Sequence, residues 1–324
     1  MNIRRSGAGT SVSLRTLESL PTSTSRSLND VLKLTPQATT GGGGFSAGGG
    51  NYRSSYITVD GAAFNNAFGI GSNLPAGGSP ISLDAIEQMS INITPYDVRQ
   101  GGFTGAAVNS VTKRGTNELK ASVYDYYTSN QFAGLKYANK AGDVLELPAS
   151  EYTSNTIGVT VGGPIIKDKL FFFFNFETEP KTAPATNWLA NDGSWDPKNT
   201  ASPVHRPTAA TLDGMKDYLA KTYNGYNPGR YENFSVDIPV TKILGRLDWN
   251  INRDHKFTVR YSQVERKTIS LASDSVNPIG DGAGNVGYTK KTGGRKTSYC
   301  LPFESAYYFS EDNFYSIAGE LNSR

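Results

Sequence analysis

The stretch TKILGRLDWNINRDHKFTVRYS, residues 241–262, decides the fold class of this chain, because apolar and polar side chains alternate along it. Its first half places mainly apolar residues at odd positions, and its even positions include Lys242, Arg246 and Asp248. A period of two is typical of a β-strand with one apolar and one polar face. The tetrad NRDH, residues 252–255, supplies a tight turn between two such strands. The stretch therefore predicts a β-hairpin.

The same alternation recurs between residues 116 and 324, where connections alternate in length. With the two strands of the hairpin, it predicts about seven strands, the others at 119–128, 152–162, 169–178, 297–309 and 313–322. The connections 163–168, 252–255 and 310–312 are short, whereas 180–239 and 268–296 are long, and a helix is expected at 211–223. Short turns on one rim and long loops on the other are typical of an outer-membrane β-barrel.

Residues 1–115 differ in composition, being rich in Gly, Ser, Thr and Asn. They predict a mixed α/β unit. Its expected elements are a short helix at 27–34, a flexible loop at Gly41–Gly50, a strand at 56–60, and a helical turn at 81–88 that leads into a strand at 89–94. We therefore divide the chain into two domains, 1–115 and 116–324.

Composition excludes several classes of function. A net charge of +3 without a basic stripe argues against a nucleic-acid partner. The single cysteine, Cys300, forms no internal disulfide, and His205 and His255 lie far apart without metal-ligand spacing. No apolar run is long enough for a membrane helix, and the N-terminal residues lack the apolar core of a secretory signal. We expect no enzyme activity, metal or cofactor.

Three segments resemble one family. The run IEQMSINITPYDVRQGGFTGAAVNSVTKRGTN, residues 86–117, resembles the end of the plug domain in TonB-dependent receptors, especially the large Oar-like group. In that group a Gly-rich stretch precedes a V-N-x-V-T-K strand and a linker into the barrel. YITVDG, residues 56–61, looks like the plug strand and turn, and VGGPIIKDKLFFFFNFE, residues 161–177, looks like the second and third barrel strands.

The resemblance implies a mixed α/β plug domain at 1–115, followed at 116–324 by part of an antiparallel transmembrane β-barrel in the bacterial outer membrane. It also implies energised uptake of a scarce nutrient bound by external loops. The implied partners are outer-membrane lipid, an unknown extracellular ligand and the inner-membrane TonB complex. Because such barrels have about 22 strands, and the energy-coupling peptide does not occur in this sequence, we expect a truncated chain. Neither the substrate nor any ligand-contacting residue is specified.

Several glycines and loop residues suggest sites that a simpler interpretation explains. Gly41–Gly50 lacks the Gly-Lys-Ser/Thr of a phosphate loop, and Gly101, Gly102 and Gly105 lack the context of a dinucleotide site, so we expect plug loops and turns. Asp281 and Asn285 faintly resemble a calcium loop that has too few oxygens.

The chemistry-bearing side chains leave further alternatives. Trp188 and Trp195 could stack on a sugar or an aromatic ligand, or pack locally within their loop. Glu177 and Glu179 could form a glycosidase pair, although charge facing the lumen explains them better. Two other functions stay open: a non-transporting, adhesin-like surface barrel, and a secreted carbohydrate-binding or carbohydrate-hydrolysing β-sandwich.

The alternation also predicts which face of the barrel sheet meets residues 1–115. Lipid favours an apolar outer face, and the lumen is polar. The residues expected to point away from 1–115 are Ile243, Leu247, Trp249, Phe257, Val259 and Tyr261, and those expected to point toward it are Arg246, Asp248, Lys256 and Arg260. A secreted sandwich requires the apolar set to be covered by protein.

Overall fold

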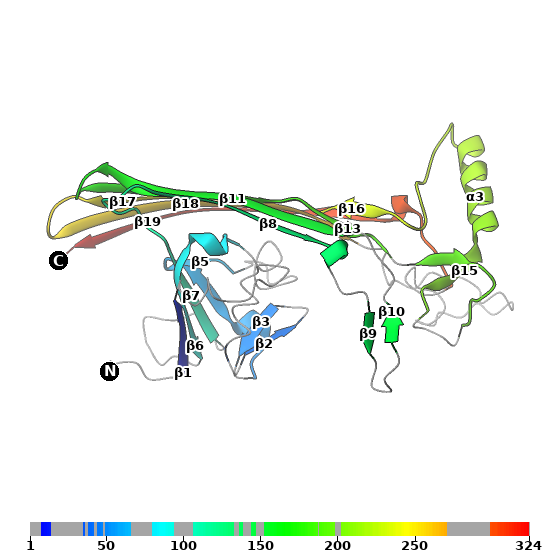
Figure 1. Cartoon of the computed structure of the whole chain (residues 1–324), viewed down its shortest axis with the longest axis horizontal. Coiled ribbons are helices and arrows are strands. Elements are labelled where there is room, and N and C mark those ends of the chain that lie inside the picture. The colour runs from blue at the N-terminus through cyan, green and yellow to red at the C-terminus, as the bar shows by residue number, and fades with distance from the viewer. Residues whose placement is uncertain are drawn as a thin grey trace.

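A computed structural model describes most of the chain and shows two packed sheets (Figure 1). The residues described are 8–13, 35, 38–41, 44–47, 49–65, 80–93, 106–132, 136–138, 144–146, 152–186, 188–197, 202–270 and 299–323. A long sheet, here called the wall sheet, runs the length of the molecule. A smaller N-terminal sheet packs on one face of it, which we call the inner face.

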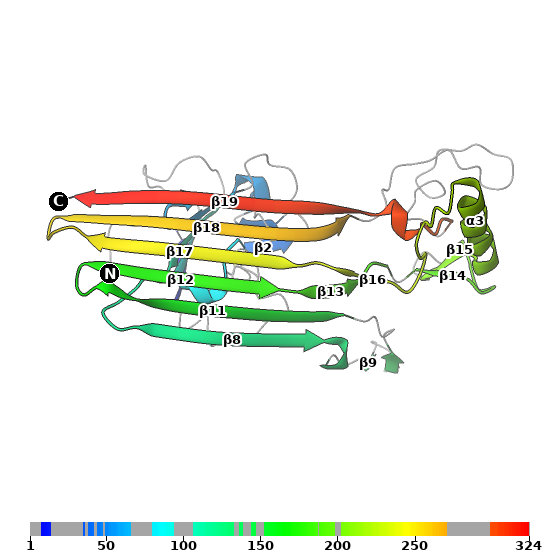
Figure 2. The ribbon, with the colours of Figure 1, turned by 90° about the horizontal axis from the view of Figure 1, so that it is seen from above.

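The wall sheet is antiparallel throughout, with its six long strands side by side (Figure 2). In spatial order these strands are β8 (Lys120–Ser129), β11 (Thr153–Ile166), β12 (Leu170–Glu179), β17 (Val240–Asn250), β18 (His255–Ser270) and β19 (Tyr308–Ser323). Two short strands, β13 (Lys181–Pro184) and β16 (Ser235–Asp237), extend it beyond β11 and β12 and complete eight strands. The described strands do not close into a barrel.

The predicted hairpin at 297–309 and 313–322 is wrong. A single strand, β19, runs through the expected turn at 310–312, and Ser310 pairs with Thr268 of the extended β18. Residues 299–307 form no strand and include the 3₁₀ helix η5 (Glu304–Ala306). Ser, Glu and Asp favour turns, but partners on β18 here satisfy their backbone groups.

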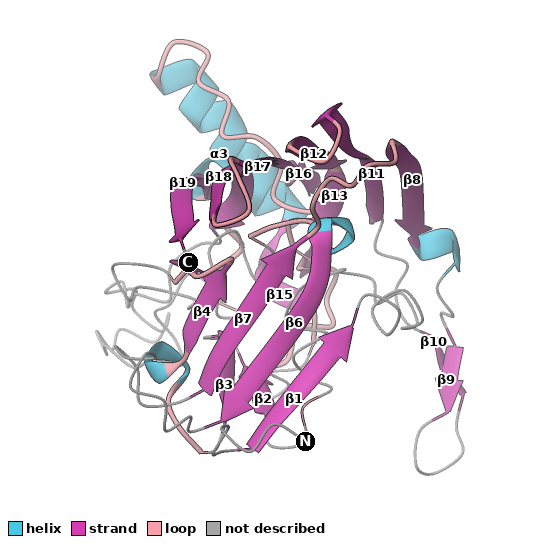
Figure 3. Cartoon of the chain, turned by 90° about the vertical axis from the view of Figure 1, so that its left-hand side faces the viewer, coloured by secondary structure: helices cyan, strands magenta, loops and turns pink. Residues whose placement is uncertain are grey.

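The N-terminal sheet has the order β1-β6-β7-β4-β5. Its strands are β1 (Ala8–Ser13), β4 (Tyr56–Val59), β5 (Ala62–Ala63), β6 (Ile86–Ile93) and β7 (Ala106–Thr112), with the 3₁₀ helices η1 (Tyr52–Ser54) and η3 (Leu83–Ala85). In this sheet β4 and β7 pair in parallel (Figure 3), and its other described strand pairs are antiparallel. Ile57, Val59, Met89, Ile91 and Val108 are almost fully buried and form its core. A mixed α/β unit was expected here, and its described part consists of strands with short 3₁₀ helices.

The glycine-rich segment is not simply a flexible loop. Two strands, β2 (Ala38–Gly41) and β3 (Gly44–Ala47), pair as an antiparallel hairpin within and beside Gly41–Gly50. Phe45 is fully buried in the core of the N-terminal sheet and anchors the hairpin there. An apolar anchor explains why a segment of glycines is ordered. The helix expected at 27–34 lies outside the described residues.

The end of the wall sheet far from the chain termini carries the long connection 180–239. This connection contains β13, the parallel pair β14 (Leu189–Asn191) and β15 (Val204–Thr208), helix α3 (Ala209–Thr222) and β16. The Thr208 side chain caps α3, and Gly225, with φ +82°, follows its end, so the helix expected at 211–223 is confirmed. Nearby lie η4 (Asn130–Phe132) and the pair β9 (Lys136–Ala138) and β10 (Val144–Glu146).

The two faces of the wall sheet differ as the alternation predicts. On the outer face Phe257, Tyr261 and Trp249 are 37%, 37% and 48% exposed, whereas Arg260, on the inner face, is only 2% exposed. Lys256 lies at an even position of β18, on the same face as Arg260, but it is exposed. Within the described residues no protein covers the apolar outer face, which argues against a secreted sandwich.

No helix in the described part of the chain is both long enough and apolar enough to span a membrane.

The linker from the N-terminal sheet to the wall packs closely against the turn between β11 and β12. A Cβ atom on Gly115 would lie 2.7 Å from the Gly163 carbonyl oxygen and would clash with that of Phe172. The Asn117 side chain donates a hydrogen bond to the Asp168 carboxylate and accepts one from the Asp168 N–H. The Asn250 side chain donates to the Asp168 carbonyl, so the linker, the turn and β17 are joined.

We expect Gly115→Ala to destabilise this junction by about 1–3 kcal/mol, because the methyl group meets rigid backbone rather than a side chain. Gly245→Ala is the matched control, since a Cβ there meets nothing within 4 Å. Thermal unfolding followed by circular dichroism measures both variants. Equal unfolding midpoints for the two would contradict the close approach.

Candidate functional site

A tight turn on the N-terminal sheet presents one carboxylate to the wall sheet. Asp60 and Gly61 join β4 to β5, and their φ values of +46° and +81° meet the condition of a type I′ hairpin turn. The N–H and hydroxyl groups of Thr112 donate to the Asp60 carboxylate at 2.8 and 2.7 Å. The orientation of this carboxylate is therefore fixed within the N-terminal sheet.

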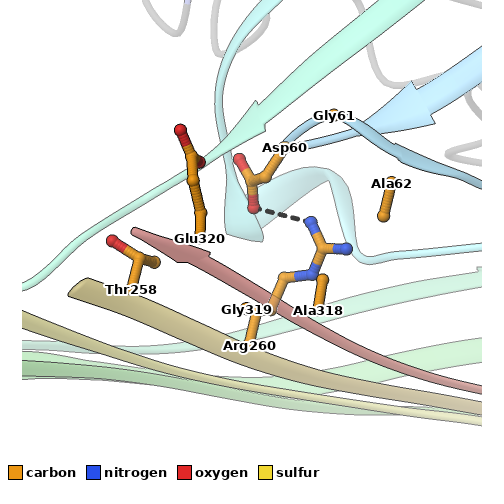
Figure 4. A pocket seen from close by; sticks show the side chains of 8 residues that line it. All are labelled: Asp60, Gly61, Ala62, Thr258, Arg260, Ala318, Gly319 and Glu320. Carbon is orange, nitrogen blue, oxygen red and sulfur yellow. Dashed lines mark hydrogen bonds and ion pairs between the residues drawn. The ribbon is translucent and has the colours of Figure 1, made fainter. Parts of the chain in front are cut away.

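The Asp60 carboxylate lies against two arginines of the wall. Arg246 on β17 and Arg260 on β18 stand directly opposite each other in the strand register. Like charges in that position repel. Asp60 Oδ2 lies 2.8 Å from Arg260 Nη1 (Figure 4), and Asp60 Oδ1 lies 3.5 Å from Arg246 Nη1. One carboxylate from the N-terminal sheet thus compensates a charge conflict within the wall.

The two arginines differ in their other partners. Arg246 forms a two-pronged ion pair with Asp248 on its own strand, with its Nη2 at 2.8 Å, and donates to the Thr112 carbonyl at 3.2 Å. Arg260 Nη1 also donates to the Val59 carbonyl, and its guanidinium lies over the Phe64 ring. Its Nε and Nη2 atoms are buried without a hydrogen-bond partner among the described residues.

A second polar contact joins the sheets at Ser82, the N-cap of η3. Its hydroxyl donates to Glu177 Oε2 at 2.6 Å, and the Tyr124 hydroxyl donates to the same oxygen at 2.8 Å. Glu177 Oε1 accepts from Lys242 Nζ at 2.7 Å, and these two residues oppose each other in the β12–β17 register. Because both charges belong to the wall, this pair is neutral without the N-terminal sheet.

Apolar contacts fill the space between the polar ones. Leu244 and Phe173, on the inner face of the wall, belong to the same buried core as the N-terminal sheet. The rings of Phe64 and Phe314 lie 4.8 Å apart. The inner face is therefore not uniformly polar, and apolar burial contributes to holding the sheets together.

A cavity of about 410 Å³ lies beside the Asp60–Arg260 pair. Figure 4 shows the residues that line it: Asp60, Gly61, Ala62, Thr258, Arg260, Ala318, Gly319 and Glu320. It combines one cation, two carboxylates and small side chains at the boundary between the two sheets.

An aromatic cluster joins the long connection to the segment before β19. Trp188 stacks on His205 at 4.7 Å between ring centroids, and Trp195 packs edge-on against Tyr299 at 5.1 Å. His205 Nδ1 is hydrogen-bonded to the Cys300 carbonyl. Burial lowers the pKa of His205, and this hydrogen bond partly opposes the shift. Trp188 thus packs within its own loop, which was one of the two alternatives, whereas Trp195 packs on Tyr299 in the segment before β19.

The remaining sequence-predicted residues form no shared site. His255 lies at the opposite end of the wall sheet from His205, as the first residue of β18, where its side chain is hydrogen-bonded to Ser323. The Glu177 carboxylate is occupied by Lys242, Ser82 and Tyr124, as expected of charge facing inward, whereas Glu179 meets only Ser154 at 3.5 Å. Gly101, Gly102, Gly105, Asp281 and Asn285 lie outside the described residues. Within the described ranges, no three His, Cys, Asp or Glu side chains are grouped to hold a metal ion.

Sequence reasoning missed Asp60, Ser82 and Tyr124 as contact residues. The Asp-Gly dipeptide is a strong signal for a hairpin turn, so it could have indicated that Asp60 is exposed at a tip. No local signal indicates its partner, because Arg260 lies far along the chain.

Comparison with known proteins gives a consistent picture. A family model described as an outer membrane beta barrel domain matches residues 111–302. The TonB-dependent transporter Oar of Myxococcus xanthus is 28% identical over 295 residues, which cover 87% of this chain and 26% of that protein. The probable TonB-dependent siderophore receptor PirA of Acinetobacter baumannii is 33% identical over 93 residues, covering 28% of this chain and 10% of that protein. The chain thus spans about a quarter of the length of the Oar transporter.

Solved structures show the same fold. The siderophore receptor PirA from Acinetobacter baumannii matches with a TM-score of 0.53 at 19% identity, over 85% of this chain and 34% of that one. The outer membrane transporter YddB from Escherichia coli matches with a TM-score of 0.57 at 12% identity, over 98% of this chain and 37% of that one. At these identities the likeness shows the fold alone.

We expect Asp60→Asn to weaken the attachment of the N-terminal sheet by about 3–5 kcal/mol, because it leaves two opposed, largely buried arginines without their shared carboxylate. The measurement is the urea concentration at which protease begins to cleave residues 56–112. Asp237→Asn is the control, since it removes the same charge from β16, where Asp237 contacts only the Thr182 hydroxyl among the interactions described. An unchanged urea midpoint for Asp60→Asn would contradict the assigned role.

Proposed function

We propose that this chain, which belongs to the family of outer membrane beta barrel domains, forms the plug domain and part of the barrel wall of a transporter that takes up a scarce nutrient. The chain is similar to TonB-dependent receptors, and its place is the bacterial outer membrane. In the proposal, residues 1–115 are the plug and residues 116–324 are part of the wall.

The observation that carries the proposal is the attachment of the N-terminal sheet to the inner face through Asp60 and Ser82. A barrel satisfies its backbone hydrogen bonds by closing, but a wide closed barrel is an open pore. A separate unit on the polar face removes that leak. Its attachment combines a few polar contacts with limited apolar burial, rather than a uniformly apolar interface, which supports a plug that moves.

The proposed mechanism is conformational and involves no bond chemistry. Extracellular ligand binds the long connections, among them 180–239, in which Trp188 packs on His205. The TonB complex of the inner membrane then supplies the work that separates Asp60 from Arg246 and Arg260. A carboxylate hydrogen-bonded to an arginine suits this role, because a charge-assisted hydrogen bond is strong at short range and is lost when donor and acceptor move slightly apart.

Nutrient depletion tests the proposal even while the identity of the substrate is open. The bacterium that encodes the protein, its deletion strain and a complemented strain are grown in one medium, and mass spectrometry follows the loss of each solute. We expect at least one solute to be depleted only when the gene is present, and a protonophore to stop that depletion. Identical depletion by all three strains would support the non-transporting surface barrel instead.

The proposed membrane topology has a separate test. The turns near residues 163–168 and 252–255 should face the periplasm, and the connection 187–233 should face outward, as should residues 273–294, which lie outside the described residues. With Cys300→Ser as background, a membrane-impermeant maleimide should label Ser194→Cys on sealed cells and Asp254→Cys only after permeabilisation; both side chains lie in exposed residues. Labelling of both positions on sealed cells would contradict the proposed topology.

A further inference from the structure

The inward-facing cations of the wall differ in how they are neutralised. Lys242 has Glu177, and Arg246 has Asp248, so each forms an ion pair with a carboxylate of the wall itself. Arg260 does not: among the described residues its only ion pair is with Asp60, which belongs to the N-terminal sheet. If the N-terminal sheet moves away, Arg260 is the cation that loses its counter-ion.

Loss of that partner is costly where Arg260 lies. The side chain is 2% exposed, and two of its three guanidinium nitrogens already lack a hydrogen-bond partner among the described residues. It also faces Arg246 across the ladder. Separation uncovers Arg260, because the N-terminal sheet provides its burial, but leaves the guanidinium beside the like charge of Arg246 without a counter-ion. A carboxylate of the wall close to Arg260 relieves this repulsion.

The wall holds one carboxylate in the right position. Arg260 pairs directly with Ala318 on β19, and Thr258, two residues before Arg260, pairs with Glu320. Glu320 is therefore the diagonal neighbour of Arg260 on the same face of the sheet, a separation that long side chains span. Both side chains line the cavity beside Asp60 (Figure 4). In the attached state Glu320 accepts a hydrogen bond from the Asn322 side chain instead.

We propose that Glu320 is the exchange partner of Arg260: when the N-terminal sheet separates from the wall, the guanidinium turns from Asp60 to Glu320. The cavity already gives the side chain room to turn in the attached state, and Ala318, which lies beside Arg260 on the wall, offers little obstruction. Gly61 and Ala62 leave with the N-terminal sheet when it separates. The exchange gives Arg260 the same arrangement that Lys242 and Arg246 already have, a carboxylate within the wall. It concerns the attachment of the two sheets and holds whether or not the protein transports a nutrient.

The exchange makes a prediction that is unusual for the loss of a charged residue. Glu320 stabilises the separated state, so its removal should make the attached state more persistent. A purely structural role of Glu320 predicts the reverse, since its loss would loosen the wall.

The test uses the protein expressed from its complete gene and purified in detergent, with Cys300→Ser as background. Leu244→Cys reports separation, because Leu244 is 1% exposed and is buried beneath the N-terminal sheet. We expect Glu320→Gln to slow maleimide labelling of this cysteine about tenfold, the size of one charge-assisted hydrogen bond. Glu311→Gln is the control, because it removes an exposed carboxylate of β19 far from Arg260 and should leave the rate unchanged.

A second background separates exchange from simple repulsion between Glu320 and Asp60. In Arg260→Met, a buried apolar replacement expected to fold, the cation is absent while both carboxylates remain. Under the proposal Glu320→Gln then has no effect on labelling, and Glu320→Asp in the original background restores part of the rate. An unchanged or faster rate for Glu320→Gln alone would overturn the proposal, and so would an undiminished slowing in Arg260→Met.

Discussion

A carboxylate between two opposed arginines holds the parts of this molecule in register. Strand pairing places Arg246 and Arg260 side by side on the inner face of the wall, where the two positive charges repel. Asp60 enters from the other sheet on a turn whose backbone geometry requires positive φ at both central residues. The Asp60 carboxylate therefore offsets the repulsion between Arg246 and Arg260 in the wall. The same contact attaches the N-terminal sheet and fixes its orientation.

The wall sheet tolerates this arrangement because its faces meet different environments. Aromatic and aliphatic side chains lie exposed on the outer face, as a strand in lipid requires, and charged side chains on the inner face pair across the ladder or with the N-terminal sheet. The pair Glu177–Lys242 is complete within the wall, whereas Arg260 is not. Arg260 is therefore the described inward-facing cation whose ion pair depends on the N-terminal sheet, while Ser82 and the apolar core add further contacts between the sheets.

Local patterns in the sequence predicted strands of the wall and the hairpin of β17 with β18, but not the contacts between the two sheets. The alternation in 241–262 located β17, β18 and the faces of the sheet, since period-two patterning is a local property. The polar run Ser310–Asp312 was wrongly predicted to be a turn. Its turn propensity is overridden by pairing with β18. Gly41–Gly50 was predicted from its composition to be a flexible loop. Burial of Phe45 instead holds part of it in a strand pair. The contact of Asp60 with Arg260 joins distant parts of the chain, and no period or local motif encodes it.

The junction around Gly115 sets a limit on how far the N-terminal sheet travels. Asn117 is hydrogen-bonded to the Asp168 turn, and the Lys113 N–H just after β7 donates to the Ala85 carbonyl of the N-terminal part, so only residues 114–116 can extend between them. Fully stretched, this tether spans about 14 Å. The N-terminal sheet can therefore move as a rigid body only within that distance of the rim of the wall. A larger displacement has to break the pairing of β7 from its end, one residue at a time.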